Sequence, residues 1–303
     1  MMLQRILRLG AICFSVVVVA WLAVVLWHFP WAVDPPVIRE ETLKAFYTAA
    51  YEPENKMVKD TPLARAALKA AETFHIRDRG AQFVSDYNLL NGRILDVGSG
   101  SGYLQDVVAD YTGLDISPTA ARYYHKKFVA GTATAMPFRD GEFDAAWSVW
   151  VLEHIPNPEA ALHEIRRVVK KGGYVYLNPA WACVPWAADG YDARPYSDFG
   201  MTGKLIKASI PIRRSWRFQR SYTLPARAVR SLVTGPTQLH YRRLTPNYRE
   251  YWQADSNAVN SLDPFEVARW FESRGDVCVN CPASRIRGVY PTCLLYTSPS
   301  PRD

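Results

Sequence analysis

Three glycines that alternate with serine lie in the stretch Ile94-Leu-Asp-Val-Gly-Ser-Gly-Ser-Gly-Tyr-Leu104. The apolar run over residues 93–97 is long enough for one buried parallel strand. Because glycine has no Cβ, Gly98, Gly100 and Gly102 allow a sharp turn and let a ligand approach the backbone closely. A strand, a glycine turn and a following helix predict a nucleotide-type site at the carboxyl end of the strand.

The spacing of the glycines excludes two common nucleotide-binding loops. A dinucleotide fingerprint, G-x-G-x-x-G, requires glycine at position 103, where this chain has Tyr103. A P-loop requires Gly-Lys-Ser or Gly-Lys-Thr, which does not occur in this loop. The pattern is G-x-G-x-G, with Asp96 two residues before the first glycine. The identity of the ligand therefore depends on the residues that follow the loop.

An acidic residue ends the next short apolar run. Residues 111–116 predict a second strand, and Asp115 lies seventeen residues after Gly98. An acid at this place can accept hydrogen bonds from both ribose hydroxyls, as it does in dinucleotide folds. Ile116 is then positioned to pack against an adenine face. The alternative is an ordinary turn aspartate, but the spacing from the glycine loop favours ribose binding.

Two further stretches carry a family resemblance. Residues 131–144 resemble the segment that usually reads GDAxxLPFxDxxFD in class I S-adenosylmethionine (SAM) dependent methyltransferases. Residues 150–156, Trp-Val-Leu-Glu-His-Ile-Pro, are similar to the xxLEHxxxP stretch of that family, and the glycine loop resembles its motif I. The resemblance covers residues 93–178 in order and spacing. Within that family, this stretch generally resembles the small-molecule and quinone-biosynthesis methyltransferases.

The resemblance implies a SAM site, with the glycines beside the methionine part and the acid of the second strand on the ribose. The cofactor-binding residues implied in this way are Asp96, Gly98, Ser99, Gly100, Gly102, Asp115, Ile116, Thr132 and Ala133. Where this chain has Thr132, the family usually has an acid that meets the adenine amino group. The Thr132 hydroxyl can still accept a hydrogen bond, and the Ala133 amide can still donate one. No metal site is expected.

His154 is the one titratable group that the pattern places near the sulfonium. Imidazole titrates near neutral pH and can deprotonate an acceptor hydroxyl as the methyl group moves. The alternative is a histidine at a helix start that makes only a structural hydrogen bond. Methyl transfer can proceed largely by in-line positioning, so a base is not obligatory. His154 is thus a candidate base, and catalysis by positioning alone stays open.

The elements expected to position these residues alternate between strands and helices. Strands are expected over residues 93–97, 111–116, 128–131, 143–149 and 174–177, with a sixth over 276–280. Helices are expected over residues 38–52, 61–74, 104–109, 118–127, 158–169 and 265–273. The first two can cover the cofactor or simply pack on the sheet. Four β-α steps with short connections predict a right-handed, doubly wound, Rossmann-like α/β sheet.

An apolar stretch near the N-terminus predicts a membrane anchor. Residues 10–29 are apolar except for Ser15 and His28, and a bilayer-spanning helix requires about 20 apolar residues. A cleaved signal peptide is the alternative, but its apolar region is normally ~7–15 residues and ends at an A-x-A-like site. Basic residues flank the stretch almost equally, so charge leaves the orientation open. Because SAM is made in the cytoplasm, the catalytic domain is expected there.

Residues 178–261 interrupt the expected sheet after its fifth strand. The insertion opens with aromatic residues in turn-rich sequence, and in this family the segment at this place commonly covers the acceptor site. From Lys204 to Arg249 it has eleven Lys or Arg and no Asp or Glu, within a chain of net charge +7. Beside a membrane anchor, the favoured partner is an anionic lipid surface or a lipid-like acceptor. RNA and an ordinary solvated face are the alternatives.

The cysteines predict neither a disulfide scaffold nor a metal site. Cys278-Val-Asn-Cys281 has C-x-x-C spacing but no second pair, so it is interpreted as structural. Residues 293–303 resemble a translated sequencing adapter, in which case the natural sequence ends near Thr292. A seventh strand is then expected to be incomplete or missing.

These observations divide the chain into six segments. They are a membrane anchor (1–30), a linker with a helical cap (31–90), a SAM-binding core (91–178), a basic, aromatic-rich insertion (179–261), a truncated C-terminal part of the core (262–292) and a non-native tail (293–303). The predicted function is SAM-dependent methylation of a small-molecule or lipid-like acceptor at the membrane. A non-catalytic SAM-binding scaffold that regulates a membrane partner is the alternative. A nicotinamide-dependent dehydrogenase is opposed by Tyr103.

Overall fold

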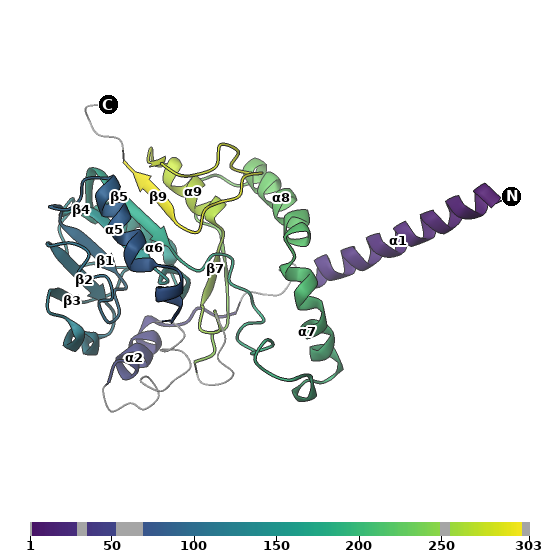
Figure 1. The fold of residues 1–303 in the computed structure, drawn as a ribbon, viewed down its shortest axis with the longest axis horizontal. Helices are drawn as coiled ribbons and strands as arrows, with labels where there is room; N and C mark the ends of the chain where they lie inside the picture. The colour runs from purple at the N-terminus through teal and green to yellow at the C-terminus, as the bar shows by residue number, and fades with distance from the viewer. Residues whose placement is uncertain (1, 29–34, 53–68, 249–254, 299–303) are drawn as a thin grey trace.

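The computed structural model describes residues 2–28, 35–52, 69–248 and 255–298. Figure 1 shows an α/β body from which one long helix projects at the N-terminus. The described part of the body contains a seven-stranded sheet and a smaller two-stranded one, β6 (Tyr241–Arg243) with β7 (Asn260–Leu262). The large sheet positions the residues discussed below.

The projecting helix, α1, spans Met2–His28. Its segment Gln4–Ala23 is long and apolar enough to cross a membrane, and none of that segment is buried by the rest of the protein. A signal sequence near the N-terminus can have the same length and apolar composition. Trp21 donates from Nε1 to Ser221 Oγ at 2.9 Å, which ties α1 to helix α8 (Trp216–Val233).

The large sheet has the strand order β3-β2-β1-β4-β5-β9-β8. Five strands run parallel: β1 (Ile94–Val97), β2 (Tyr111–Asp115), β3 (Lys127–Ala130), β4 (Phe143–Val149) and β5 (Val169–Asn178). The last two, β8 (Val277–Cys278) and β9 (Leu294–Thr297), add an antiparallel edge. The chain order moves outward from β1 to β3 and then returns to β4, which creates a switch point beside β1. The Rossmann-like α/β class predicted from the sequence is confirmed.

Alternate side chains of the strands pack on opposite faces of the sheet. On one face, Ile94 and Trp147 contact the core formed with Phe83 of helix α5 (Ile76–Asp86). On the other, Leu95 belongs to the core that includes α6 (Pro158–Val168) and α9 (Pro264–Glu272). Because both faces are buried, the strands read as continuous apolar runs, which is why they were visible in the sequence.

The connections after β1 and β2 differ from the predicted helices. Residues 101–107 form successive turns instead of an α-helix, and a 3₁₀ helix, η1 (Pro118–Tyr123), replaces the helix expected to reach residue 127. In the connection after β1, the glycines have positive φ, which does not favour α-helical geometry. In the connection after β2, the helix ends earlier than expected because β3 already begins at Lys127. The helix expected over residues 158–169 is confirmed as α6, which Asn157 caps by accepting from the Ala160 amide at 3.1 Å.

The segments around the core supply the remaining helices. The helix expected over residues 38–52 is α2 (Glu40–Ala50). The one expected over residues 61–74 lies largely outside the described residues, although residues 69–73 are helical. The insertion contains η3 (Tyr196–Asp198), α7 (Met201–Arg214) and α8, and η2 (Leu152–His154) follows β4. In Figure 1, α7 and α8 lie where α1 leaves the body.

The end of the chain corrects one expectation and contains a disulfide. The seventh strand is present as β9, because Leu294 and Tyr296 are buried and Tyr296 stacks on Phe271 of α9 with ring centroids 4.0 Å apart. Apolar residues of a native or a non-native tail can both form this edge strand. The non-native origin of residues 293–303 therefore stays a prediction. The pair Cys278 and Cys281 forms a disulfide, which the sequence analysis did not anticipate.

Candidate functional site

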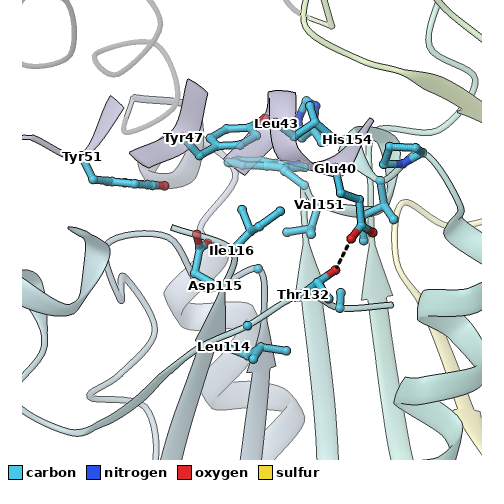
Figure 2. Close-up of a pocket in the computed structure, with 16 residues that line it drawn as sticks. Glu40, Leu43, Tyr47, Tyr51, Leu114, Asp115, Ile116, Thr132, Val151 and His154 are labelled. Carbon is cyan, nitrogen blue, oxygen red and sulfur yellow. Dashed lines mark hydrogen bonds between the residues drawn. The ribbon is translucent and has the colours of Figure 1, made fainter. Parts of the chain in front are cut away.

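A pocket of about 690 Å³, open mouth included, lies above the carboxyl ends of the central strands. Its floor comes from the loop after β1 and the end of β2, and its walls come from the loop after β3, η2 and α2. Figure 2 shows the side chains of α2 over residues at the ends of the strands. This is the place where open α/β sheets bind ligands, at the switch in strand order.

The glycine loop takes a conformation that other residues would disfavour. Gly98, Gly100 and Gly102 have φ values of +72°, +51° and +74°. A Cβ on Gly98 would lie 2.3 Å from a methyl of Val151, and one on Gly100 would lie 2.6 Å from the hydroxyl of Tyr51. The amides of Gly98 and Ser99 both donate to the Leu114 carbonyl, at 2.8 and 3.0 Å. The loop is therefore fixed to β2, and a side chain at position 98 or 100 would overlap with Val151 or Tyr51.

Asp115 is held in the pocket by two backbone amides. Its Oδ2 accepts from Gly100 N and its Oδ1 from Ser117 N, each at 2.9 Å. Burial raises the pKa of Asp115, and these two hydrogen bonds oppose that shift. Each carboxylate oxygen keeps a second lone pair for an incoming hydroxyl. The side chain is thus fixed as a double acceptor, which is what a ribose diol requires.

The other predicted residues fall into two groups. Six line the pocket: Gly98, Asp115, Ile116, Thr132, Ala133 and His154. The other four do not line it: Ser99, Gly100 and Gly102 belong to the glycine loop, and Asp96 lies in β1. Asp96 is buried and accepts from the Tyr111 hydroxyl at 2.7 Å, and burial is the main reason that its pKa is raised to about 7.

Helix α2 brings residues to the pocket that the motif analysis did not identify. Glu40, Leu43, Tyr47 and Tyr51, from α2 and its C-terminal end, line it. Burial raises the pKa of the Tyr47 phenol well above its usual value, so this hydroxyl stays protonated. The sequence predicted a helix over residues 38–52 and left open whether it covers the cofactor or packs on the sheet. Figure 2 places Tyr47 and Leu43 above Ile116.

His154 is fixed by a hydrogen bond to the backbone. Its Nδ1 lies 3.2 Å from the Asn257 carbonyl oxygen, which can only accept, so Nδ1 carries the proton and Nε2 has the free lone pair. Burial lowers the pKa of His154, which keeps the ring neutral at neutral pH. Nε2 lies 3.9 Å from Glu153 Oε1, and burial raises the pKa of that carboxyl to about 8. The imidazole can therefore accept a proton, as a general base must.

Comparison with known proteins identifies the family of the core. Residues 95–177 match the family model described as "Methyltransferase domain". This chain carries a class I SAM-dependent methyltransferase domain. A sterol 4-C-methyltransferase of Caenorhabditis elegans is 36% identical over 98 residues, which are 27% of this chain and 29% of that protein. A ubiquinone biosynthesis O-methyltransferase of Dechloromonas aromatica is 36% identical over 108 residues, covering 30% of this chain and 45% of its own length.

A solved SAM-dependent methyltransferase of Aquifex aeolicus aligns with a TM-score of 0.29 and 19% identity over 32% of this chain and 62% of its own. The chain spans less than half the length of the two curated relatives above. The similarity to these relatives therefore concerns the methyltransferase core.

The residues present fit the cofactor of this family, SAM. The glycine loop leaves no room for side chains where a ligand approaches the backbone, and Asp115 offers two acceptor oxygens beside it. Ile116 supplies an apolar surface for a base between Asp115 and Thr132. In the described part of the chain, no group of three or more His, Cys, Asp or Glu side chains can hold a metal ion.

Proposed function

We propose that this chain is a membrane-anchored methyltransferase that transfers a methyl group from SAM to a neutral small-molecule or lipid-like acceptor. The observation that carries the proposal is the pocket of the methyltransferase domain, in which Asp115 and the glycine loop are pre-formed. Bound SAM supplies a methyl group that is activated by a positively charged sulfur. The chain itself has to orient the acceptor, exclude water and receive a proton.

The residues proposed for these three tasks all line the pocket. Leu43, Tyr47 and Trp150 line it with apolar and aromatic surface, which suits an apolar acceptor and excludes water. We assign the role of general base to His154 Nε2, for an acceptor that loses a proton as the methyl group moves. For an acceptor that loses none, positioning alone suffices. The relatives named for a sterol and for ubiquinone biosynthesis support the choice of an apolar substrate class.

The membrane part of the proposal rests on the surface around α1. The Trp21–Ser221 hydrogen bond places α8 next to one end of the apolar segment Gln4–Ala23. Leu205, Ile212 and Trp216 of α7 and α8 are 55%, 57% and 63% exposed, on the part of the body from which α1 projects. Large apolar side chains beside a membrane anchor are stabilised when they enter the interface of the bilayer.

The basic block of the insertion contributes fewer free charges than its composition indicates. Arg227 is paired with Asp263 at 2.7 Å, Arg230 with Glu266 at 3.3 Å, and Arg214 with Asp192. These contacts hold α7 and α8 to the body. Lys204 and Arg217 are exposed beside the apolar residues of α7 and α8, so the proposed attraction to anionic lipid comes from this smaller set, at roughly 1 kcal/mol each.

The test uses the full chain in lipid nanodiscs with one neutral and one anionic lipid composition. We expect formation of S-adenosylhomocysteine from SAM when a sterol or a quinol is added, and loss of cofactor binding in Asp115→Ala. Binding without turnover for any neutral acceptor would favour the non-catalytic scaffold, and absence of binding would refute both. In the cytoplasm, where the catalytic domain is proposed to lie, the Cys278–Cys281 pair would be held as thiols.

A further inference from the structure

The carboxylate of Glu40 lies at the end of the pocket where the family's usual acid is replaced. Glu40 is the first residue of α2, yet its side chain reaches the loop after β3, 92 residues further along the chain. Oε2 accepts from Thr132 Oγ1 at 3.1 Å, and Oε1 accepts from Thr134 Oγ1 at 2.7 Å. Figure 2 shows the Glu40–Thr132 hydrogen bond on the side of Ile116 away from Asp115.

The hydrogen-bond directions determine what this corner of the pocket can recognise. A carboxylate only accepts, so the hydroxyls of Thr132 and Thr134 donate to Glu40. The Thr132 oxygen accepts from the Thr134 amide at 3.3 Å and lies 2.9 Å from the Thr134 hydroxyl oxygen, so its lone pairs face Thr134. Each Glu40 oxygen accepts one of these hydroxyls and keeps a second lone pair, so the carboxylate presents acceptors, as an aspartate at position 132 would.

A donor lies next to these acceptors. Within the described residues, the Ala133 amide makes no hydrogen bond, and Ala133 lines the same pocket. The edge of adenine offers an amino donor at C6 and an acceptor at N1, whereas hypoxanthine offers a carbonyl acceptor and an N–H donor at the same places. An acceptor beside a donor therefore matches adenine and opposes hypoxanthine.

We propose that Glu40 supplies, from α2, the carboxylate that reads the adenine amino group, with Thr132 orienting it. This inference rests on the proposed function, because it assigns a part of the same cofactor site. It makes α2 a component of cofactor recognition as well as a cover. It also explains why threonine is compatible with cofactor binding at position 132: an aspartate there would place a second carboxylate against Glu40, and like charges at that distance repel.

The test compares two ligands, S-adenosylhomocysteine and S-inosylhomocysteine, which differ only at the 6-position and in the protonation of N1 of the base. Binding to the full chain in detergent micelles is measured by calorimetry for wild type, Glu40→Gln and Glu41→Gln. We expect wild type to prefer the adenosyl ligand at least about 10-fold, the scale of one hydrogen bond to a charged group. In Glu40→Gln the amide can turn its NH₂ toward the 6-oxo group, so the preference should fall to within about 3-fold. Glu41, exposed on the same helix, is the matched control and should keep the wild-type ratio.

A purely structural role of Glu40 gives a different result. If the side chain only fastens α2 to the loop, Glu40→Gln weakens both ligands equally and the ratio stays at the wild-type value, which overturns the inference. Failure of wild type to bind either ligand overturns the proposed function together with it.

Three further variants test the same carboxylate by moving it from position 40 to position 132. Glu40→Ala should weaken the adenosyl ligand about 10-fold, and Glu40→Ala with Thr132→Asp should recover most of that loss. Thr132→Asp alone should bind more weakly than wild type because of the repulsion from Glu40. Equal effects of Thr132→Asp with and without Glu40 would contradict the shared role. Circular dichroism of each variant verifies that it is folded.

Discussion

Replacement of Gly98 by alanine tests the steric account of the glycine loop. Two costs are expected. The left-handed backbone, φ +72°, costs an alanine about 1–2 kcal/mol. The new Cβ would lie 2.3 and 2.4 Å from the two γ-methyls of Val151, where carbon atoms normally stay ≈ 3.5–4.0 Å apart, and overpacking of this kind costs about 1–3 kcal/mol. The free energy of unfolding should therefore fall by about 2–5 kcal/mol.

A matched control separates the two costs. Gly275 also has a positive φ, +83°, but a Cβ there would meet no atom within 4 Å. Gly275→Ala should consequently lose only the backbone contribution, and the difference between the two variants measures the overlap with Val151. Removal of both γ-methyls by Val151→Ala should restore part of the stability of Gly98→Ala, although the Val151 Cβ would remain at 2.9 Å.

The assay is urea unfolding of the full chain in a mild detergent, with midpoints compared at constant m-value. Calorimetric titration with S-adenosylhomocysteine provides a second readout, since a displaced loop also displaces Asp115 through the Gly100 amide. If Gly98→Ala were as stable as Gly275→Ala and bound the ligand normally, the proposed packing between the loop and Val151 would be refuted.

Three further perturbations have defined outcomes. Burial raises the pKa of Glu153 to about 8, so the folded chain holds a proton that the unfolded chain releases near pH 4.5. The contribution of Glu153 to stability should therefore fall as pH rises between these values, by up to about 1.4 kcal/mol per pH unit. Glu153→Gln should reduce this slope in urea titrations at pH 5 to 8.5 and leave the part that comes from Asp96, whose pKa burial raises to about 7. Arg227→Met should lower stability by about 1–2 kcal/mol because it breaks a largely buried pair with Asp263, whereas Arg217→Met at an exposed position should change the midpoint little. Cys281→Ser should cost at most about 2 kcal/mol under oxidising conditions, since the disulfide closes a very short loop, and should cost nothing measurable with dithiothreitol present.

The strands were predictable because the physical signal for them is local. Phe143–Val149 is apolar on both faces and bounded by polar turns, and the structure has β4 at those residues. The helix after the glycine loop was wrong for a reason that is also local: Gly102 has φ +74°, and residues 101–107 make i to i−3 turns around it. Apolar spacing alone did not weigh that cost.

The contacts between distant segments could not be predicted. The sequence predicted a helix over residues 38–52, but the approach of Glu40 to Thr132 depends on how α2 lies across the sheet. Likewise, the arginines of the insertion were recognised by composition, whereas their pairing with Asp263 and Glu266 follows from the packing of α8 against α9. Composition counts charges, and only the fold determines which of them remain available to a partner.

The distribution of charge along the pocket bears on the choice of acceptor. Around the proposed adenosine site, the carboxylate oxygens of Asp115 and Glu40 can accept hydrogen bonds from donors on a ligand. His154 lines the same pocket, and burial lowers its pKa and raises that of the neighbouring Glu153, so both groups are neutral near pH 7. A neutral apolar acceptor can lie beside these two groups without leaving an ion unpaired, whereas a cationic amine would lose hydration next to two uncharged side chains. An acceptor screen should therefore favour sterols, quinols or other uncharged hydroxyl compounds, and turnover confined to charged amines would contradict this assignment of the pocket.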